Sequence, residues 1–312
     1  MTVSHMVCSS RAVTVKLLDL IWRSPLAPDL SPAPEKLNRS RKKMDFTGRL
    51  MPRARGVKQR DVSYGGVSCV QHQPRHAPSN RVVLYFHGGG YCVGSPDTHN
   101  HMVSRLAKRA AMCAVVPRYR KAPEHPYPAP LEDAVSVYQA LLDEGIKPGN
   151  LYLAGDSAGG NLVLVLLLRL KQEGMPLPAA ACCISPWTDM GLQGDTLNTK
   201  ANTDNMLNGD LLEHFAQLYT QGMAAEQRCQ QPYLSPLAGD LAGLPPLLVQ
   251  VGSEEVLLDD AVRLTEKAQQ AGVAVELQIW EKMQHVWHLS FPVLKDGRLA
   301  ILEIAEFFDR NQ

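Results

Sequence analysis

The chain has 312 residues, of which 45% are hydrophobic and 20% are charged, and its formal net charge is +1. This length can bury one large core, and the near-neutral charge argues against nucleic acid as the main partner. The seven cysteines are odd in number, scattered, and without the Cys/His spacing of a zinc site. We therefore expect reduced thiols, no bound metal and a cytoplasmic protein.

The N-terminal part of the chain holds two segments of unusual composition. Residues 12–22 are apolar, but Lys16 and Asp19 interrupt the run and no cleavage site follows, which favours an amphipathic helix over a signal peptide. Residues 39–61 carry nine Lys and Arg against two Asp. Without interleaved aromatic residues, this stretch is interpreted as a solvated connector rather than a polyanion or membrane-surface patch.

A strand-like run, residues 81–86, leads into His87 and the three glycines Gly88, Gly89 and Gly90. Consecutive glycines expose backbone N–H groups, which can stabilise the oxyanion of a tetrahedral intermediate. Such a run can also be a flexible loop or a phosphate cradle, but no Lys-Ser/Thr follows to make a P-loop. These glycines form the predicted oxyanion loop, with Gly89 and Gly90 as its donors.

A second motif begins with the apolar residues 151–154 and continues as Gly155-Asp156-Ser157-Ala158-Gly159. A serine at a tight turn between a strand and a helix projects its hydroxyl above the sheet, and the flanking glycines remove side chains that would collide. The apolar stretch 162–168 supplies the following helix and is too short to cross a bilayer. The pattern predicts Ser157 as a nucleophile, with the amide of Ala158 as a third oxyanion donor; the alternative is a polar helix N-cap.

These two motifs together resemble the hormone-sensitive lipase family of α/β-hydrolases, in its bacterial carboxylesterase branch. The segments 119–129 and 185–189 are similar to further family motifs, so the resemblance runs from about residue 81 to the C-terminus. It implies an ester hydrolase that acts on short-to-medium acyl esters through an acyl-enzyme and has no cofactor.

Strand and helix signals alternate from Arg81 onward. This alternation predicts a mostly parallel central sheet with helices on both faces. The resemblance implies that this sheet belongs to an α/β-hydrolase fold with a helical cap. We assign residues 1–45 to an N-terminal cap segment, 190–232 to a cap insertion, and 46–189 with 233–312 to the catalytic core. The insertion contains a capped amphipathic helix that begins after Asn208.

The acid and the base of a triad should follow Ser157 in the chain. In the resembled family the acid is the third residue after the glycine that ends a buried strand, here Gly252, which implies Glu255. Glutamate is an accepted acid in α/β-hydrolases. Asp259 and Asp260 compete for this role, but their position before a helical segment suits helix capping.

The predicted base is His285, in the loop beyond the alternating strand-like segment 275–280. Its surroundings resemble the base loop of the family, and an imidazole suits proton transfer near neutral pH. His288, three residues later, is the local rival and is interpreted as a packing or surface residue. The catalytic residues predicted are therefore Ser157, Glu255 and His285.

Other functions remain compatible with these motifs. The same machinery cleaves amides, as in a deacetylase of the same family, and the fold can serve as a small-molecule receptor, as in the plant gibberellin receptors. A serine, an acid candidate and a histidine in the right order favour turnover. We expect a small-molecule ester as substrate, no nucleic acid and no stable membrane insertion; a homodimer is compatible with the sequence, which does not fix the oligomeric state.

Overall fold

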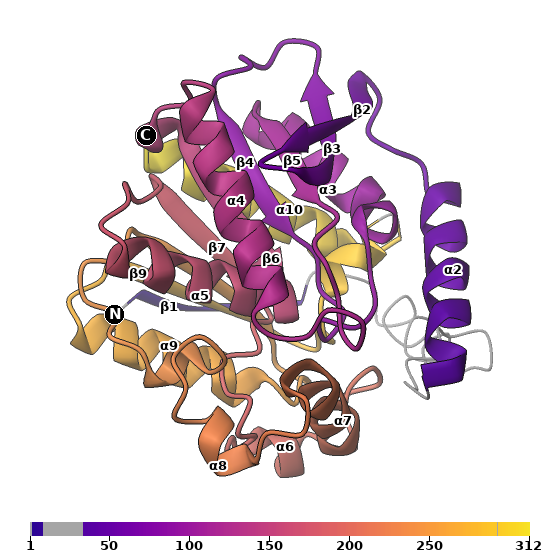
Figure 1. The fold of residues 1–312 in the computed structure, drawn as a ribbon, viewed down its shortest axis with the longest axis vertical. Helices are drawn as coiled ribbons and strands as arrows, with labels where there is room; N and C mark the ends of the chain where they lie inside the picture. Colours follow the sequence, from indigo (N-terminus) through magenta and orange to yellow (C-terminus); the bar gives the residue numbers. More distant parts are fainter. Residues whose placement is uncertain (1, 9–33, 292) are drawn as a thin grey trace.

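The computed structural model describes residues 2–8, 34–291 and 293–312. Within these residues a nine-stranded sheet has the order β1-β9-β8-β7-β6-β4-β5-β3-β2 (Figure 1). β3 pairs antiparallel with β2 and β5, and the other neighbours are parallel, which confirms the predicted sheet. The strands are β1 (Thr2–Met6), β2 (Val57–Tyr64), β3 (Val67–Pro74), β4 (Val82–Phe86), β5 (Cys113–Pro117), β6 (Leu151–Asp156), β7 (Ala180–Ile184), β8 (Leu247–Gly252) and β9 (Val275–Trp280).

Helices cover both faces of the sheet (Figure 1). Residues of α4, α5 and α9 join the core cluster on one face, and residues of α3 and α10 join the cluster on the other. The helices are α2 (Pro34–Leu50), α3 (Pro96–Ala110), α4 (Ala129–Asp143), α5 (Ala158–Gln172), α6 (Thr196–Thr199), α7 (Gly209–Thr220), α8 (Ala225–Arg228), α9 (Leu258–Gln270) and α10 (Lys295–Arg310), with 3-10 turns at Pro148–Asn150, Pro236–Ala238 and Trp287–Ser290.

The central strand β4 shows why the core strands are recognisable in the sequence. Successive side chains of a strand point to opposite faces. Val82, Leu84 and Phe86 pack on the α5 side, whereas Val83 and Tyr85 pack on the α3 side. Since helices cover both faces, all five side chains are buried and the strand is a continuous hydrophobic run.

The N-terminal region differs in part from the expected cap segment 1–45. The helix predicted at residues 12–22 lies outside the described residues. Thr2–Met6, expected in the cap, instead form β1, which pairs in parallel with β9 and places Thr2 opposite Glu276. An edge strand of five residues is too short to give a clear period in the sequence. α2 also crosses the expected boundary, since it continues to Leu50.

The insertion 190–232 is helical, with α6, α7 and α8 beyond one end of the sheet (Figure 1). The predicted cap of α7 is present, because the side-chain oxygen of Asn208 accepts a hydrogen bond from the Leu211 amide at 2.8 Å. None of the described helices is long and apolar enough to span a bilayer.

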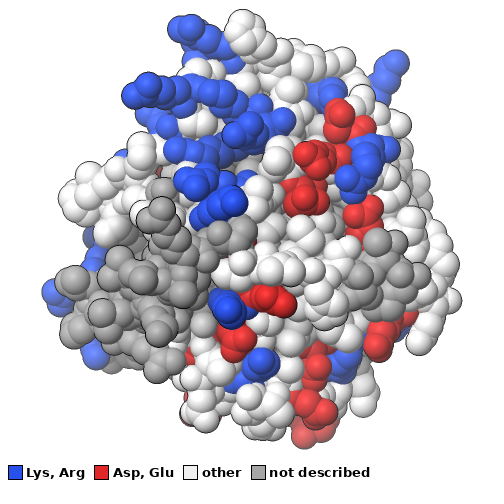
Figure 2. Space-filling model, turned by 180° about the vertical axis from the view of Figure 1, so that it is seen from behind, with Lys and Arg blue, Asp and Glu red and all other residues white. Residues whose placement is uncertain are grey.

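The basic stretch 39–61 runs from α2 into β2, and its basic side chains beyond α2 lie at the surface. Lys and Arg gather on one part of the face shown in Figure 2. The side chains of Arg53, Arg55 and Lys58 are exposed. Lys108 of α3 donates to the backbone oxygen of Arg55 at 2.8 Å, which ties this stretch to the core. The interpretation of residues 39–61 as a connector was therefore wrong in part, because residues 39–50 belong to α2 and residues 57–61 to β2, and only residues 51–56 connect the two elements.

Candidate active site

Ser157 lies at the corner between β6 and α5. Its φ and ψ angles are 54° and −121°, a region that non-glycine residues rarely adopt and that marks functional turns. A Cβ on Gly155 would lie 2.3 Å from the Gly159 oxygen, and a Cβ on Gly159 would lie 2.0 Å from the Phe86 oxygen. The turn therefore needs both glycines. Ser157 begins the helix without a capping hydrogen bond from its side chain, so the N-cap alternative does not explain it.

Glu255 and His285 are in contact. The Nδ1 atom of His285 lies 2.9 Å from Oε2 of Glu255, and both side chains are buried. Burial lowers the pKa of His285, but the hydrogen bond and the negative charge of Glu255 outweigh it, so that this pKa is raised. With Nδ1 bound to Glu255, Nε2 is the nitrogen left to exchange a proton.

The second oxygen of Glu255 has two further partners that the sequence did not indicate. Oε1 accepts a hydrogen bond from the Ser185 hydroxyl at 2.7 Å and one from the Gly252 amide at 2.7 Å. The Ser185 oxygen in turn accepts from the Val286 amide, next to His285, at 3.3 Å. These bonds fix the carboxylate and the histidine loop relative to each other. Ser185 belongs to a family motif, but only its position after β7 brings it to Glu255.

The competing residues have other roles. Asp260 does not cap α9; its Oδ2 accepts hydrogen bonds from the Thr188 and Asp189 amides at 2.6 and 2.9 Å. The prediction that Asp259 and Asp260 cap the helix was wrong, since α9 has no side-chain cap, but both residues lie in its first turn, where the helix dipole favours acidic groups. His288 is a packing residue: it is buried and its Nε2 lies 2.8 Å from Oε1 of Gln250. Burial lowers the pKa of His288 to about 3.

The oxyanion loop faces the nucleophile from the end of β4. Gly89 and Gly90 have φ angles of 121° and 58°, which explains the need for glycine there. Among the described residues, no acceptor meets the amides of these two glycines. The amide of Gly88 differs, since it donates to Oδ2 of Asp156 at 3.1 Å. Gly89, Gly90 and Ala158 thus remain the candidate donors, and Gly88 holds the loop in place.

His87, which directly precedes these glycines, stabilises the oxyanion loop through its contacts with Tyr119. It is buried, its ring stacks on Tyr119 with centroids 4.3 Å apart, and the Tyr119 hydroxyl donates to the His87 backbone oxygen at 2.7 Å. Burial lowers the pKa of His87 well below its ordinary value. The histidine of this motif therefore acts as a neutral structural residue.

A cavity contains Ser157 and His285 in its wall. The oxyanion loop forms another part of the wall, and the remaining surface is mainly apolar. A mainly apolar lining with a few polar groups is typical of small-ligand sites. The apolar lining includes Trp187, Met206, Leu207, Leu212, Phe215 and Leu289.

The cap insertion contributes to this cavity and is tied to the site. Phe215 of α7 lies directly over Gly90, where a Cβ would approach its ring to 2.4 Å. The carboxylate of Asp204 accepts a hydrogen bond from the Val256 amide at 3.0 Å, and Gln284 donates to the Thr203 oxygen at 2.9 Å. The insertion therefore contacts the segments that contain Glu255, His285 and Gly90.

Comparison with known proteins supports this description. A family model described as alpha/beta hydrolase fold matches residues 83–289. An acetyl-hydrolase of Streptomyces hygroscopicus is 46% identical over 231 residues, 74% of this chain and 76% of the relative. An esterase of Acinetobacter venetianus is 36% identical over 294 residues, 94% of each chain. The crystal structure of an esterase from the bacterial hormone-sensitive lipase family has 39% identity and a TM-score of 0.89, covering 97% of this chain and 99% of that chain. The residues matched by the family model include the whole site described above.

Proposed function

The chain belongs to the bacterial hormone-sensitive lipase family of α/β-hydrolases, a family of carboxylic-ester hydrolases, and on that premise we propose that it is a serine carboxylesterase for short-to-medium acyl esters. The observation that carries this proposal is the contact between His285 and Glu255, together with the presence of His285 and Ser157 in the wall of one cavity. Its relationship to esterases over nearly its full length speaks against the alternative of a non-catalytic receptor.

In the proposed mechanism, the Ser157 hydroxyl attacks the ester carbonyl while His285 removes its proton. The amides of Gly89, Gly90 and Ala158 donate to the oxyanion of the tetrahedral intermediate. His285 then gives the proton to the leaving alcohol, and an acyl-enzyme forms on Ser157. Water activated by His285 hydrolyses this ester in the same way. Glu255 holds the imidazole and stabilises its protonated form, and the chemistry needs no cofactor.

A second candidate function is removal of an acetyl group from an amine. The relative from Streptomyces hygroscopicus is named an acetyl-hydrolase, a name that fits cleavage of either an acetyl ester or an acetyl amide. The same serine, histidine and oxyanion donors cleave both bonds, and the amide demands better protonation of the leaving nitrogen. Hydrolysis of acetanilides at a rate comparable to that of acetyl esters would favour this function.

The test is a panel of p-nitrophenyl esters and anilides of graded acyl length. We expect hydrolysis by the wild type, and losses of kcat of about 10⁴-fold or more for Ser157→Ala and His285→Ala. Glu255→Ala should lose about 10³- to 10⁴-fold. Mass spectrometry of a rapidly quenched reaction should find the acyl group on the peptide that contains Ser157.

Asp259→Ala is the matched control, because it removes a nearby carboxylate that, among the described residues, accepts a hydrogen bond only from the Thr196 amide. It should keep wild-type kcat. An inert wild type that binds esters without cleaving them would overturn the proposed function. Full activity of Glu255→Ala would move the role of the acid to another carboxylate.

A further inference from the structure

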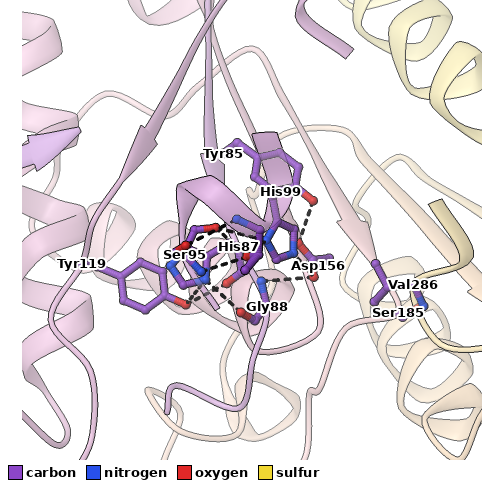
Figure 3. A network of polar contacts seen from close by, with 10 residues as sticks. Tyr85, His87, Gly88, Ser95, His99, Tyr119, Asp156, Ser185 and Val286 are labelled. Atoms are coloured by element: carbon purple, nitrogen blue, oxygen red, sulfur yellow. Dashed lines mark hydrogen bonds and ion pairs between the residues drawn. The ribbon is translucent and has the colours of Figure 1, made fainter. Parts of the chain in front are cut away.

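The residue before the nucleophile, Asp156, is the centre of a buried polar network (Figure 3). Its side chain is almost completely buried. Oδ1 accepts a hydrogen bond from the Tyr85 hydroxyl at 2.7 Å, and Oδ2 lies 3.2 Å from Nε2 of His99. Burying a carboxylate is costly unless it is paired and hydrogen-bonded, so this network has to be complete to be stable.

The same carboxylate is bound to the oxyanion loop. The Gly88 amide donates to Oδ2 of Asp156 at 3.1 Å, and a Cβ on Gly88 would lie only 2.3 Å from that oxygen. Gly88 directly precedes the donors Gly89 and Gly90, while Asp156 directly precedes Ser157. One side chain therefore connects the backbone of the nucleophile to the backbone that receives the oxyanion.

His99 supplies the charge that balances this carboxylate. It lies in the first turn of α3, is buried, and its Nδ1 is 2.7 Å from the Thr98 hydroxyl. Burial lowers the pKa of His99, but the charge and hydrogen bond of Asp156 raise it more. For Asp156, burial raises the pKa, but His99 and the Tyr85 hydroxyl lower it more. The neutral ring of His87 and the Tyr85 hydroxyl complete the surroundings of the pair.

We propose that His99 and Asp156 are positioning residues that hold the oxyanion loop in register with the nucleophile. This inference rests on the proposed esterase function. Without His99, the Asp156 carboxylate loses its cationic partner and no longer fixes the Gly88 amide. The backbone amides of Gly89 and Gly90 are then no longer directed at the oxyanion, although the substrate still fits the same cavity. Replacement of either residue should therefore reduce stabilisation of the transition state and leave binding of the ester unchanged.

The test compares His99→Gln, Asp156→Ala, Asp156→Asn and Tyr85→Phe with the wild type on p-nitrophenyl butyrate. Loss of one oxyanion donor costs roughly 10²- to 10³-fold in kcat, so misplacement of the loop should cost part of that. We expect kcat to fall by about 10² in Asp156→Ala and about tenfold in His99→Gln, with KM changed by less than about threefold. Asp156→Asn keeps an acceptor oxygen and should recover part of the loss.

A transition-state analogue separates positioning from a general structural effect. An alkyl trifluoromethyl ketone adds to the serine hydroxyl, and the resulting hemiketal oxygen occupies the oxyanion site. A simple alkyl ketone of the same length reports on the cavity alone. Because the proposal concerns only the oxyanion, the inhibition constant of the trifluoromethyl ketone should rise by the same factor by which kcat/KM falls, and that of the simple ketone should not change.

His72→Gln is the matched control. His72 is also a buried histidine, in β3, and its ring nitrogens have no hydrogen-bond partner among the described residues. This variant should leave kcat and both inhibition constants unchanged. If circular dichroism shows that His99→Gln does not fold, kcat and the two inhibition constants are compared in Tyr85→Phe and Asp156→Asn instead.

An equal rise in the inhibition constants of both ketones would overturn the positioning role. Wild-type kcat in His99→Gln and Asp156→Ala would also overturn it. Neither result affects the proposed function, which fails only if the wild type is inert or if Ser157→Ala remains active. The two failures are thus distinguishable within one set of measurements.

Discussion

At the scale of single residues, His285 carries opposing influences on its protonation. Burial favours the neutral imidazole, whereas Glu255 favours the protonated form and prevails. A general base must be unprotonated before it can accept the serine proton. The raised pKa of His285 therefore has a direct consequence for the dependence of activity on pH.

We expect kcat/KM to be lost as the pH falls through a midpoint above 6.5, the ordinary pKa of histidine. In Glu255→Gln the charge that raises the pKa of His285 is removed while burial remains. The midpoint of that variant should lie below the wild-type midpoint, and kcat should also fall. Profiles of kcat/KM between about pH 5 and pH 9 check this. A midpoint unchanged by Glu255→Gln would contradict the assignment of Glu255.

The residues of the proposed nucleophile and base could be selected from the sequence because their neighbours mark them. Ser157 lies within a glycine-flanked turn, and His285 follows a recognisable strand. The residues that hold them could not be predicted. Ser185 meets Glu255 across 70 positions, and His99 meets Asp156 across 57. Such partners share no local pattern, because only the order of the strands in the sheet brings them together.

At the scale of elements, Arg41 fastens α2 to the core. Its Nε donates to the Cys92 oxygen at 2.7 Å, Nη2 donates to the Ala122 oxygen at 2.6 Å, and Nη1 lies 2.8 Å from Oε1 of Glu124. One turn along α2, Met44 lines the cavity. The placement of this helix therefore affects the wall that contacts the substrate.

Arg41→Ala should loosen α2 and raise KM for butyrate esters severalfold, with kcat within about twofold, because the reacting groups lie on other elements. Steady-state kinetics measure this effect. Lys42→Ala is the control, since the neighbouring Lys42 side chain is exposed and should leave KM unchanged. Equal KM values in both variants would show that the bonds of Arg41 do not position α2.

Phe215 of α7 limits the cavity above Gly90. Phe215→Ala should enlarge this space and shift the preference toward longer acyl chains, because additional methylene groups can then be buried. The ratio of kcat/KM for octanoate and acetate esters measures the shift and should rise by about tenfold or more. Leu218→Ala, on the same helix but outside the cavity wall, should leave the ratio unchanged. A ratio that falls in Phe215→Ala would contradict this role.

The helices and strands differ in how clearly they can be recognised from the sequence. β4 and β6 are buried on both faces and form continuous hydrophobic runs, and the Asn208 cap marks the start of α7. β2 could not be recognised in the same way. It is an edge strand with many polar residues, and its outer positions are exposed, so its sequence resembles that of a loop.

At the scale of the whole molecule, β1 covers the outer side of β9, which would otherwise be an edge of the sheet. Deletion of residues 2–6 should lower the thermal midpoint by a few degrees and promote association at high concentration, because an unpaired edge can accept another strand. Differential scanning calorimetry and sedimentation measure both effects. The kcat should remain that of the wild type, since no residue of β1 lines the cavity. An unchanged midpoint would mean that β1 contributes little to stability.

The pairing of β1 with β9 also has a consequence for the newly made chain. During translation, Thr2–Met6 leave the ribosome long before the strand they pair with, Val275–Trp280. Contacts between such distant segments form slowly, because a long loop must close before they can be made. This side of the sheet can therefore form only after β9 has been made, and until then β1 lacks the strand to which it hydrogen-bonds.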